Sequence, residues 1–148
     1  MANNTVDNEA AGRRFSRWWP VVLWMALIFV ASSMPTRLPT PGLQGFRWDD
    51  KLQHAVAYAI LAALAWRAFE DKRPRWWLVC ASIIFAVAYA AFDECHQAFV
   101  PTRECSLSDW SMDAFGAAAA ALVLDFLKKG GDGIGGQSGA RKNLRSER

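Results

Sequence analysis

Four long apolar segments, separated by short charged stretches, constrain the fold of this 148-residue chain more than any other feature. Each has 16 to 18 residues. That is near the lower limit for a helix rising about 1.5 Å per residue to cross a hydrocarbon core about 30 Å thick. Tryptophans near the segment ends are typical of anchors at a membrane interface. We therefore predict an all-α, four-helix transmembrane bundle with spans at residues 18–33, 52–69, 76–92 and 110–127.

Two other interpretations of the apolar segments have to be weighed. In a soluble bundle, the helices at the surface would need a polar face, which the first and third segments lack. The first segment also resembles a signal peptide, because RRFSR precedes an apolar run that ends in small residues. Cleavage after about Ser33 would leave three spans and the same orientation for the rest of the chain.

The Lys and Arg residues predict how the spans are oriented. Thirteen of the 17 lie before the first span, around the loop between the second and third spans, or after the fourth. Cytoplasmic segments carry the excess of these residues, so both termini are expected in the cytoplasm of a multi-pass inner-membrane protein. Residues 34–51 and 93–109 would then face outward. The net charge of +3 does not indicate nucleic acid, because the basic residues flank the apolar segments and do not line one face.

The same pattern divides the chain into three parts. Residues 1–17 form a polar N-terminal segment, and residues 18–127 form the membrane domain. The tail, residues 128–148, is rich in glycine and basic side chains, and we expect it to be disordered.

Polar side chains begin the second span, within DDKLQHAVAY at residues 49–58. Asp50, His54 and Tyr58 are spaced i, i+4 and i+8, so they share one helix face, and Lys51 adjoins it. Asp50 and Lys51 also fit an ordinary helix start, with an acidic cap and a Lys that reaches toward water. His54 lies inside the span, where ionisable groups usually have a partner or a function.

The third span ends in DECHQ, which places two adjacent carboxylates, Asp93 and Glu94, at a helix C-terminus. Negative charge there opposes the helix dipole, so the carboxylates need partners such as Arg103, Lys51 or His54. The alternative is that these side chains are simply solvated at the interface. This alternative suits Asp93 and the nearby His96 better than Glu94.

The fourth span opens with SLSDWSMDAFG, and either Ser106 or Ser108 is expected to cap its helix. Asp109, Asp113 and Gly116 share one face of that helix. An ionised Asp113 facing lipid would be unfavourable, so it should face the bundle. Gly116 and the alanines that follow it would allow close helix contact.

Three spans thus present polar faces at one membrane depth. If these faces pack together, they form one outward-opening pocket. Its expected members are Asp50, Lys51, His54, Glu94, Gln97, Arg103, Asp109 and Asp113.

These motifs together resemble the VanZ-like family of small bacterial membrane proteins, named for a protein associated with teicoplanin resistance. The family pattern is D-K-x-x-H with a Tyr one turn later, then E-x-x-Q, an aromatic residue, Pro and Arg, and finally S-x-x-D-x-x-x-N-x-x-G. The resemblance covers roughly residues 18–127, but Asp113 stands where the pattern has Asn, so an amide-specific role is in doubt. The matching residues are Asp50, Lys51, His54, Tyr58, Glu94, Gln97, Phe99, Pro101, Arg103, Ser106, Asp109 and Gly116.

The resemblance implies a four-span bundle in the cell envelope but no known reaction, and it does not transfer teicoplanin resistance to this chain. One hypothesis is an enzyme acting on a lipid-linked or cell-envelope substrate. Glu94 would be its general base or acid, and His54 a proton shuttle oriented by Asp50 or Asp109. Arg103 and Lys51 would hold a phosphate or carboxylate. The remaining expected substrate-binding residues are Asp50, Tyr58, Gln97 and Asp113.

The rival hypothesis is a non-catalytic protein whose pocket binds a lipid headgroup, a glycopeptide or a partner protein, or whose polar network only holds the bundle together. Membrane lipids are expected partners in either case, and nucleic acid is not. The same residues would serve both hypotheses.

Cofactor and disulfide expectations follow from the Cys and His residues. The chain has no close-set motif such as HExxH, so no metal or other cofactor is expected. A metal would have to be bound by residues that are not close together in the sequence: His54, Glu94, His96 and Asp109. Cys80 is expected in the core. Cys95 and Cys105 are candidates for a disulfide, which would contribute about 3 kcal/mol in the chain-entropy model.

Overall fold

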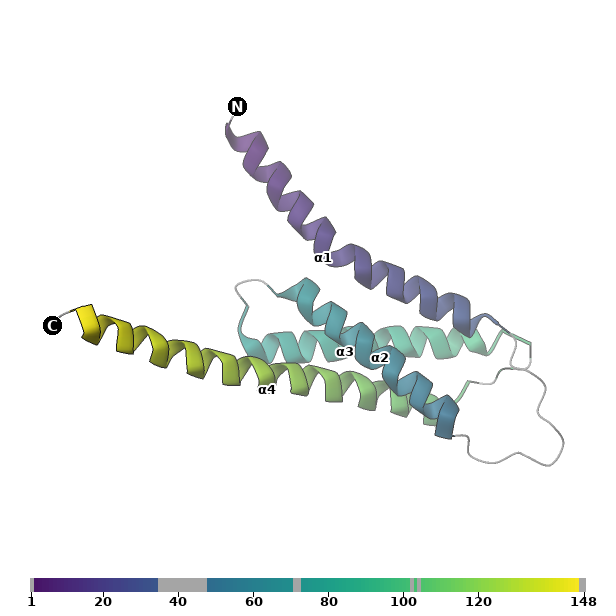
Figure 1. Cartoon of the computed structure of the whole chain (residues 1–148). Coiled ribbons are helices and arrows are strands. Elements are labelled where there is room, and N and C mark those ends of the chain that lie inside the picture. The colour runs from purple at the N-terminus through teal and green to yellow at the C-terminus, as the bar shows by residue number, and fades with distance from the viewer. Residues whose placement is uncertain (1, 35–47, 71–72, 102, 104, 147–148) are drawn as a thin grey trace.

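The computed structural model describes residues 2–34, 48–70, 73–101, 103 and 105–146 (Figure 1). These residues form four helices and no strand, which confirms the all-α prediction. The helices are α1 (Ala2–Ser32), α2 (Trp48–Phe69), α3 (Arg75–Gln97) and α4 (Leu107–Ser146). Each contains a stretch long and apolar enough to cross a membrane, so the chain is a four-helix, multi-pass membrane protein.

The candidate spans of the structure are longer at some ends than the sequence predicts. They are Phe15–Ser32, Lys51–Phe69, Arg75–Gln97 and Leu107–Gly130. The third differs most at its C-terminal end, because the polar residues 93–97 continue the helix. Carboxylates there are compatible with a helix because other helices supply hydrogen-bond donors to them.

Helices α1 and α4 extend well beyond their apolar parts. Helix α1 begins at Ala2, and α4 continues to Ser146. An existing helix grows by one hydrogen bond for each residue added, without the cost of a new nucleus. A glycine-rich sequence weakens this growth but does not forbid it.

Successive helices run in alternate directions, so the start of α1 and the end of α4 lie at the same end of the bundle (Figure 1). Basic residues gather at this end, where Arg17 donates to the Glu70 carbonyl and Lys128 pairs with the Glu70 carboxylate. Arg75 Nε also lies 2.9 Å from Asp125 Oδ1. We call this the basic end. At the opposite end, which we call the polar end, the starts of α2 and α4 meet the ends of α1 and α3.

Helix α4 packs chiefly against α2 and α3, whereas α1 contacts only α2 and α3 among the described helices. The tightest approach is at Gly116, where an added Cβ would lie 2.0 Å from the carbonyl oxygen of Ala55. Ala117 and Ala121 continue this buried strip of small residues along α4. As the sequence indicates, small side chains let the α2 and α4 backbones approach closely. This contact brings the polar starts of the two helices together.

The outer surface of the bundle is apolar, which suits contact with lipid tails. Large hydrophobic side chains on all four helices are at least one-third exposed. Among them are Val22, Leu23, Val30, Val56, Ile84, Phe92, Phe115, Leu122 and Phe126.

Candidate functional site

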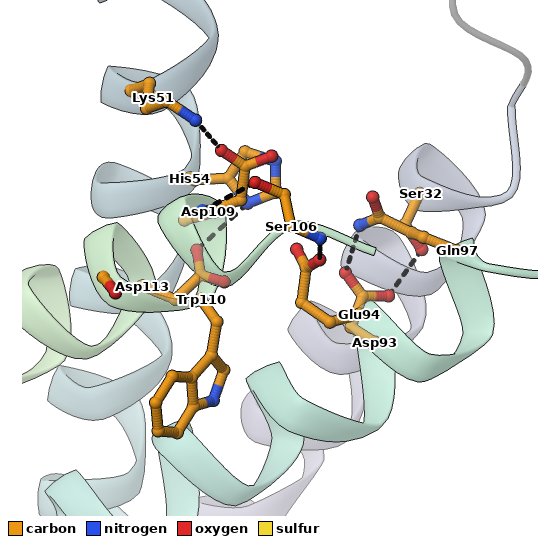
Figure 2. Close-up of polar contacts among 12 residues, drawn as sticks. Ser32, Lys51, His54, Asp93, Glu94, Gln97, Ser106, Asp109, Trp110 and Asp113 are labelled. Carbon is orange, nitrogen blue, oxygen red and sulfur yellow. Dashed lines mark hydrogen bonds and ion pairs between the residues drawn. The ribbon is translucent and has the colours of Figure 1, made fainter. Parts of the chain in front are cut away.

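A network of polar side chains from all four helices occupies the polar end (Figure 2). Four of its members are almost completely buried, with exposed fractions of 1 to 3%. These are Asp93, Glu94, Gln97 and Asp113. Buried polar groups are costly unless they are hydrogen-bonded, so the partners of each one show how the network is built.

Two ionic contacts join α2 to α4. Lys51 Nζ pairs with Asp109 Oδ1, and His54 Nδ1 lies 3.0 Å from Asp113 Oδ1. Asp113 therefore faces the bundle, as its position in an apolar segment requires. The sequence suggested Asp50 or Asp109 as the partner that orients His54, and the structure adds Asp113, one turn beyond Asp109, as the partner of Nδ1. The side chain of Asp50, the other expected partner, lies outside the described residues.

Glu94 joins α3 to the start of α4. Its Oε2 accepts a hydrogen bond of 2.7 Å from the backbone N–H of Ser106, whereas its Oε1 is buried and has no hydrogen-bond partner among the described residues. The Ser106 hydroxyl in turn accepts a 3.3 Å bond from the N–H of Asp109. Ser106, and not Ser108, is thus the cap of α4, because its hydroxyl bonds the N–H three residues on.

Asp93 joins α3 to α1. Its Oδ1 accepts a 2.5 Å hydrogen bond from the Ser32 hydroxyl, and its Oδ2 accepts a 3.1 Å bond from Gln97 Nε2. Sequence reasoning left Asp93 outside the site and missed Ser32 altogether. The spacing of Asp93 and Gln97 at i and i+4 was a usable signal, but nothing in the first span marks Ser32.

Arg103 closes the network against the end of α1. Its guanidinium donates to Gln97 Oε1 at 3.4 Å and to the carbonyls of Met34 at 3.1 Å and Ala31 at 3.2 Å. A cation at a helix C-terminus is favoured by the helix dipole. The sequence suggested Arg103 as a direct partner of Asp93 or Glu94, whereas in the structure Gln97 links Arg103 to Asp93.

A cavity of about 410 Å³ lies beside the network, between α1, α2 and α3. One wall comes from α1 and is apolar apart from Ser32. The opposite wall is polar and comes from α2 and α3, with Arg103 beside it. The lining residues are Trp24, Leu27, Ile28, Ala31, Ser32, Gln53, His54, Ala57, Tyr58, Asp93, Gln97 and Arg103.

The residues expected in a single pocket therefore form two adjacent groups, which we treat as two candidate sites, and His54 contributes to both. The first group lines the cavity beside α1 and includes Tyr58, Gln97 and Arg103. The other group lies between α2, α3 and α4: Lys51, Glu94, Asp109 and Asp113. His54, on α2, lines the cavity and also contacts Asp113 of the second group.

His96 and the cysteines lie apart from both sites. The His96 ring stacks on Phe29 with centroids 4.4 Å apart, and its Nε2 lies 3.0 Å from the Ser33 hydroxyl. Cys95 and Cys105 are free and exposed, so the candidate disulfide is not formed. Cys95 follows buried Glu94, and one residue step along a helix turns its side chain toward another face. Cys80, expected in the core, is also exposed.

Comparison with known proteins identifies the family. The model of the VanZ/LLP1 family matches residues 17–128, which is well over half of the chain and includes both sites. No curated protein and no solved structure matches the chain. The match agrees with the motifs at the polar end, and the chain belongs to the VanZ/LLP1 family.

Proposed function

We propose that the protein binds the polar headgroup of a membrane lipid, or of a lipid-linked envelope precursor, in the cavity between α1, α2 and α3. The observation that carries this proposal is the contrast between the two walls of the cavity. Apart from Ser32, α1 contributes Trp24, Leu27, Ile28 and Ala31 to the lining, whereas α2 and α3 contribute the polar residues His54, Tyr58 and Asp93. An amphipathic ligand matches such a cavity better than a wholly polar ligand or a wholly apolar ligand does.

The size of the cavity suits a headgroup. Ligand pockets commonly have volumes of about 300–1,000 Å³, and a cavity of about 410 Å³ is at the small end of that range. The acyl chains of the ligand would stay in the bilayer beside α1. Among the described helices, α1 contacts α2 and α3 but not α4, and we place the entry of the lipid from the membrane beside α1.

The charges of the wall favour a headgroup that carries both a phosphate and hydrogen-bond donors. Three N–H groups of Arg103 are already used, and a guanidinium has further donors that suit phosphate oxygens. Asp93 and Gln97 supply acceptors for hydroxyl or amine groups. The distribution of Lys and Arg supports an outer-leaflet location in the inner membrane. A role in glycopeptide susceptibility follows only if the headgroup belongs to an envelope precursor that the antibiotic also recognises.

Filling the cavity should remove the bound lipid. In Ala31→Phe, the new ring would project from the cavity lining, and we expect most of the lipid that copurifies with the wild type to be lost. The measurement is mass spectrometry of lipids released from protein purified in mild detergent. Ala26→Phe makes the same change on the same helix at an exposed position that does not line the cavity. It should keep the wild-type lipid, and equal lipid content in both variants would contradict the proposal.

Catalysis on the bound headgroup is a second candidate function, and one observation favours it. Each of His54, Glu94 and Asp109 offers a polar atom within 4.8 Å of the other two, so an acid, a base and a shuttle are close together beside the cavity. The Glu94 carboxylate would act as the general base or acid.

Envelope lipid profiles test this second candidate. A strain that lacks the protein should accumulate a lipid or precursor, wild-type protein should reverse the change, and Glu94→Gln at equal abundance should not. His96→Gln, outside both sites, should behave as wild type. If Glu94→Gln reverses the change as fully as wild type does, Glu94 is not catalytic.

A further inference from the structure

We infer that His54, Glu94 and Asp109 form a binding site for one divalent transition-metal ion of the Zn²⁺ type. The three residues come from α2, α3 and α4, and one possible ligand atom from each lies within 4.8 Å of the other two. Donor atoms about 2.1 Å from one tetrahedral ion lie about 3.4 Å apart, so the distances within the group must shorten by up to about 1.4 Å. Rotations of the three side chains are enough for that.

The contact between His54 and Asp113 prepares the imidazole for a metal. The Nδ1 of His54 lies 3.0 Å from Asp113 Oδ1, so an N–H on Nδ1 would donate to that carboxylate. This fixes the tautomer in which Nε2 carries a lone pair, turned away from Asp113. A metal-binding His commonly donates its other ring N–H to a carboxylate in this way. Asp113 is then the positioning residue of the site.

Glu94 supplies a second, independent observation. The residue is only 3% exposed, and Oε2 is held by the backbone of Ser106, yet Oε1 has no hydrogen-bond partner among the described residues. A buried carboxylate oxygen without a partner costs free energy. Glu94 belongs to the same group as His54 and Asp109, and we assign Oε1 to the metal because Oε2 is already bonded to Ser106.

Asp109 can bind an ion without losing its contact with α2. Lys51 pairs with Oδ1, so we assign the other oxygen, Oδ2, to the metal. The ammonium group of Lys51 offsets part of the negative charge of the two carboxylates. One imidazole and two carboxylates are a ligand set that suits Zn²⁺, and three protein ligands leave a position open for water or a ligand.

This inference does not depend on lipid binding. The metal site lies between α2, α3 and α4, whereas the cavity lies between α1, α2 and α3, and only His54 belongs to both. If both sites are occupied, the open position of the metal would lie near the headgroup. The sequence alone does not predict the metal, because the three ligands come from separate helices without a close-set motif.

Zinc titration of the purified full-length protein tests the site. After treatment with a chelating resin, the wild type should bind one Zn²⁺ per chain by isothermal titration calorimetry. His54→Gln, Glu94→Gln and Asp109→Asn should each weaken binding at least about tenfold, and Asp113→Asn should weaken it about tenfold through His54. The chain has two histidines, so His96→Gln is a matched control that should bind as wild type.

Cobalt gives a readout that does not rely on the variants. Co²⁺ bound to the wild type should show the visible absorption of a low-symmetry, four- or five-coordinate site, and added Zn²⁺ should remove it. Helix content and a single elution peak check the fold of each variant. A wild type that binds no stoichiometric Zn²⁺ and gives no such Co²⁺ spectrum would overturn the inference. So would folded variants that bind as tightly as wild type, because the metal would then be adventitious.

Discussion

Gly116→Ala is expected to lower the free energy of unfolding by about 2 kcal/mol, since overpacking a tight contact typically costs about 1–3 kcal/mol. The new Cβ would lie 2.0 Å from the Ala55 carbonyl oxygen and 2.7 Å from its carbon. These are backbone atoms, so no side chain can turn away, and α2 must move from α4. Alanine favours a helix over glycine by about 1 kcal/mol, so the clash must exceed that gain.

The same substitution should disturb the candidate metal site. Ala55 follows His54, and Gly116 lies about one turn beyond Asp113, so separating the helices at this contact stretches the contact between His54 and Asp113. The free energy of unfolding can be measured by denaturant titration in micelles or by steric trapping. Gly130→Ala is the control, because Gly130 lies on the same helix and has nothing within 4 Å of its added Cβ. It should be neutral or slightly stabilising. Equal effects of the two substitutions would contradict close packing at Gly116.

Asp113→Ala is expected to lower the free energy of unfolding by about 3 kcal/mol, because removing one partner of a buried charged pair typically costs about 3–5 kcal/mol. The Asp113 side chain is 1% exposed and that of His54 is 13% exposed. His54 would keep its burial and lose the acceptor at Nδ1. The substitution also leaves a small void among the residues around it.

A double-mutant cycle separates the pair from its surroundings. The effects of Asp113→Ala and His54→Ala should add to more than the effect of both together, by at least about 1 kcal/mol. Asp125→Ala removes a carboxylate at the basic end of the bundle, where Arg75 and Asp125 are each 34% exposed. A pair that is this exposed contributes about 0–1 kcal/mol. A coupling of zero between His54 and Asp113 would show that their contact does not stabilise the bundle.

The two candidate sites at the polar end suggest why this chain has its polar residues at one depth. The network holds the four helices together at this end of the bundle. On one side of it lies a cavity lined by both apolar and polar residues. On the other side, Glu94 Oε1 has no hydrogen-bond partner among the described residues. A network built only for stability would satisfy that oxygen. This unsatisfied oxygen supports our proposal that the polar end binds a ligand as well as holding the helices together.

The class of the fold, and the end of the bundle at which the polar residues gather, could both be predicted from the sequence. Segments long enough to cross a membrane, with no charge in their centres, specify transmembrane helices because an unpaired backbone is too costly in lipid. The i, i+4 spacing of Asp109 and Asp113 put both on one helix face, and the cost of an exposed carboxylate in lipid turned Asp113 inward. These are local properties, and short-range geometry is sufficient to derive them.

The hydrogen bonds and ion pairs between these polar groups could not be predicted, because they depend on the tertiary structure. The sequence offered Ser106 or Ser108 for the cap and did not name Asp113 as a partner of His54, and the structure shows Ser106 as the cap and Asp113 at Nδ1 of His54. Ser32 became part of the site because α1 packs against α3, which no spacing within α1 reveals. Pairing between helices depends on their rotation and on the depth at which they meet. Here both are set by the approach of Gly116 to Ala55, a contact between residues 61 positions apart in the chain.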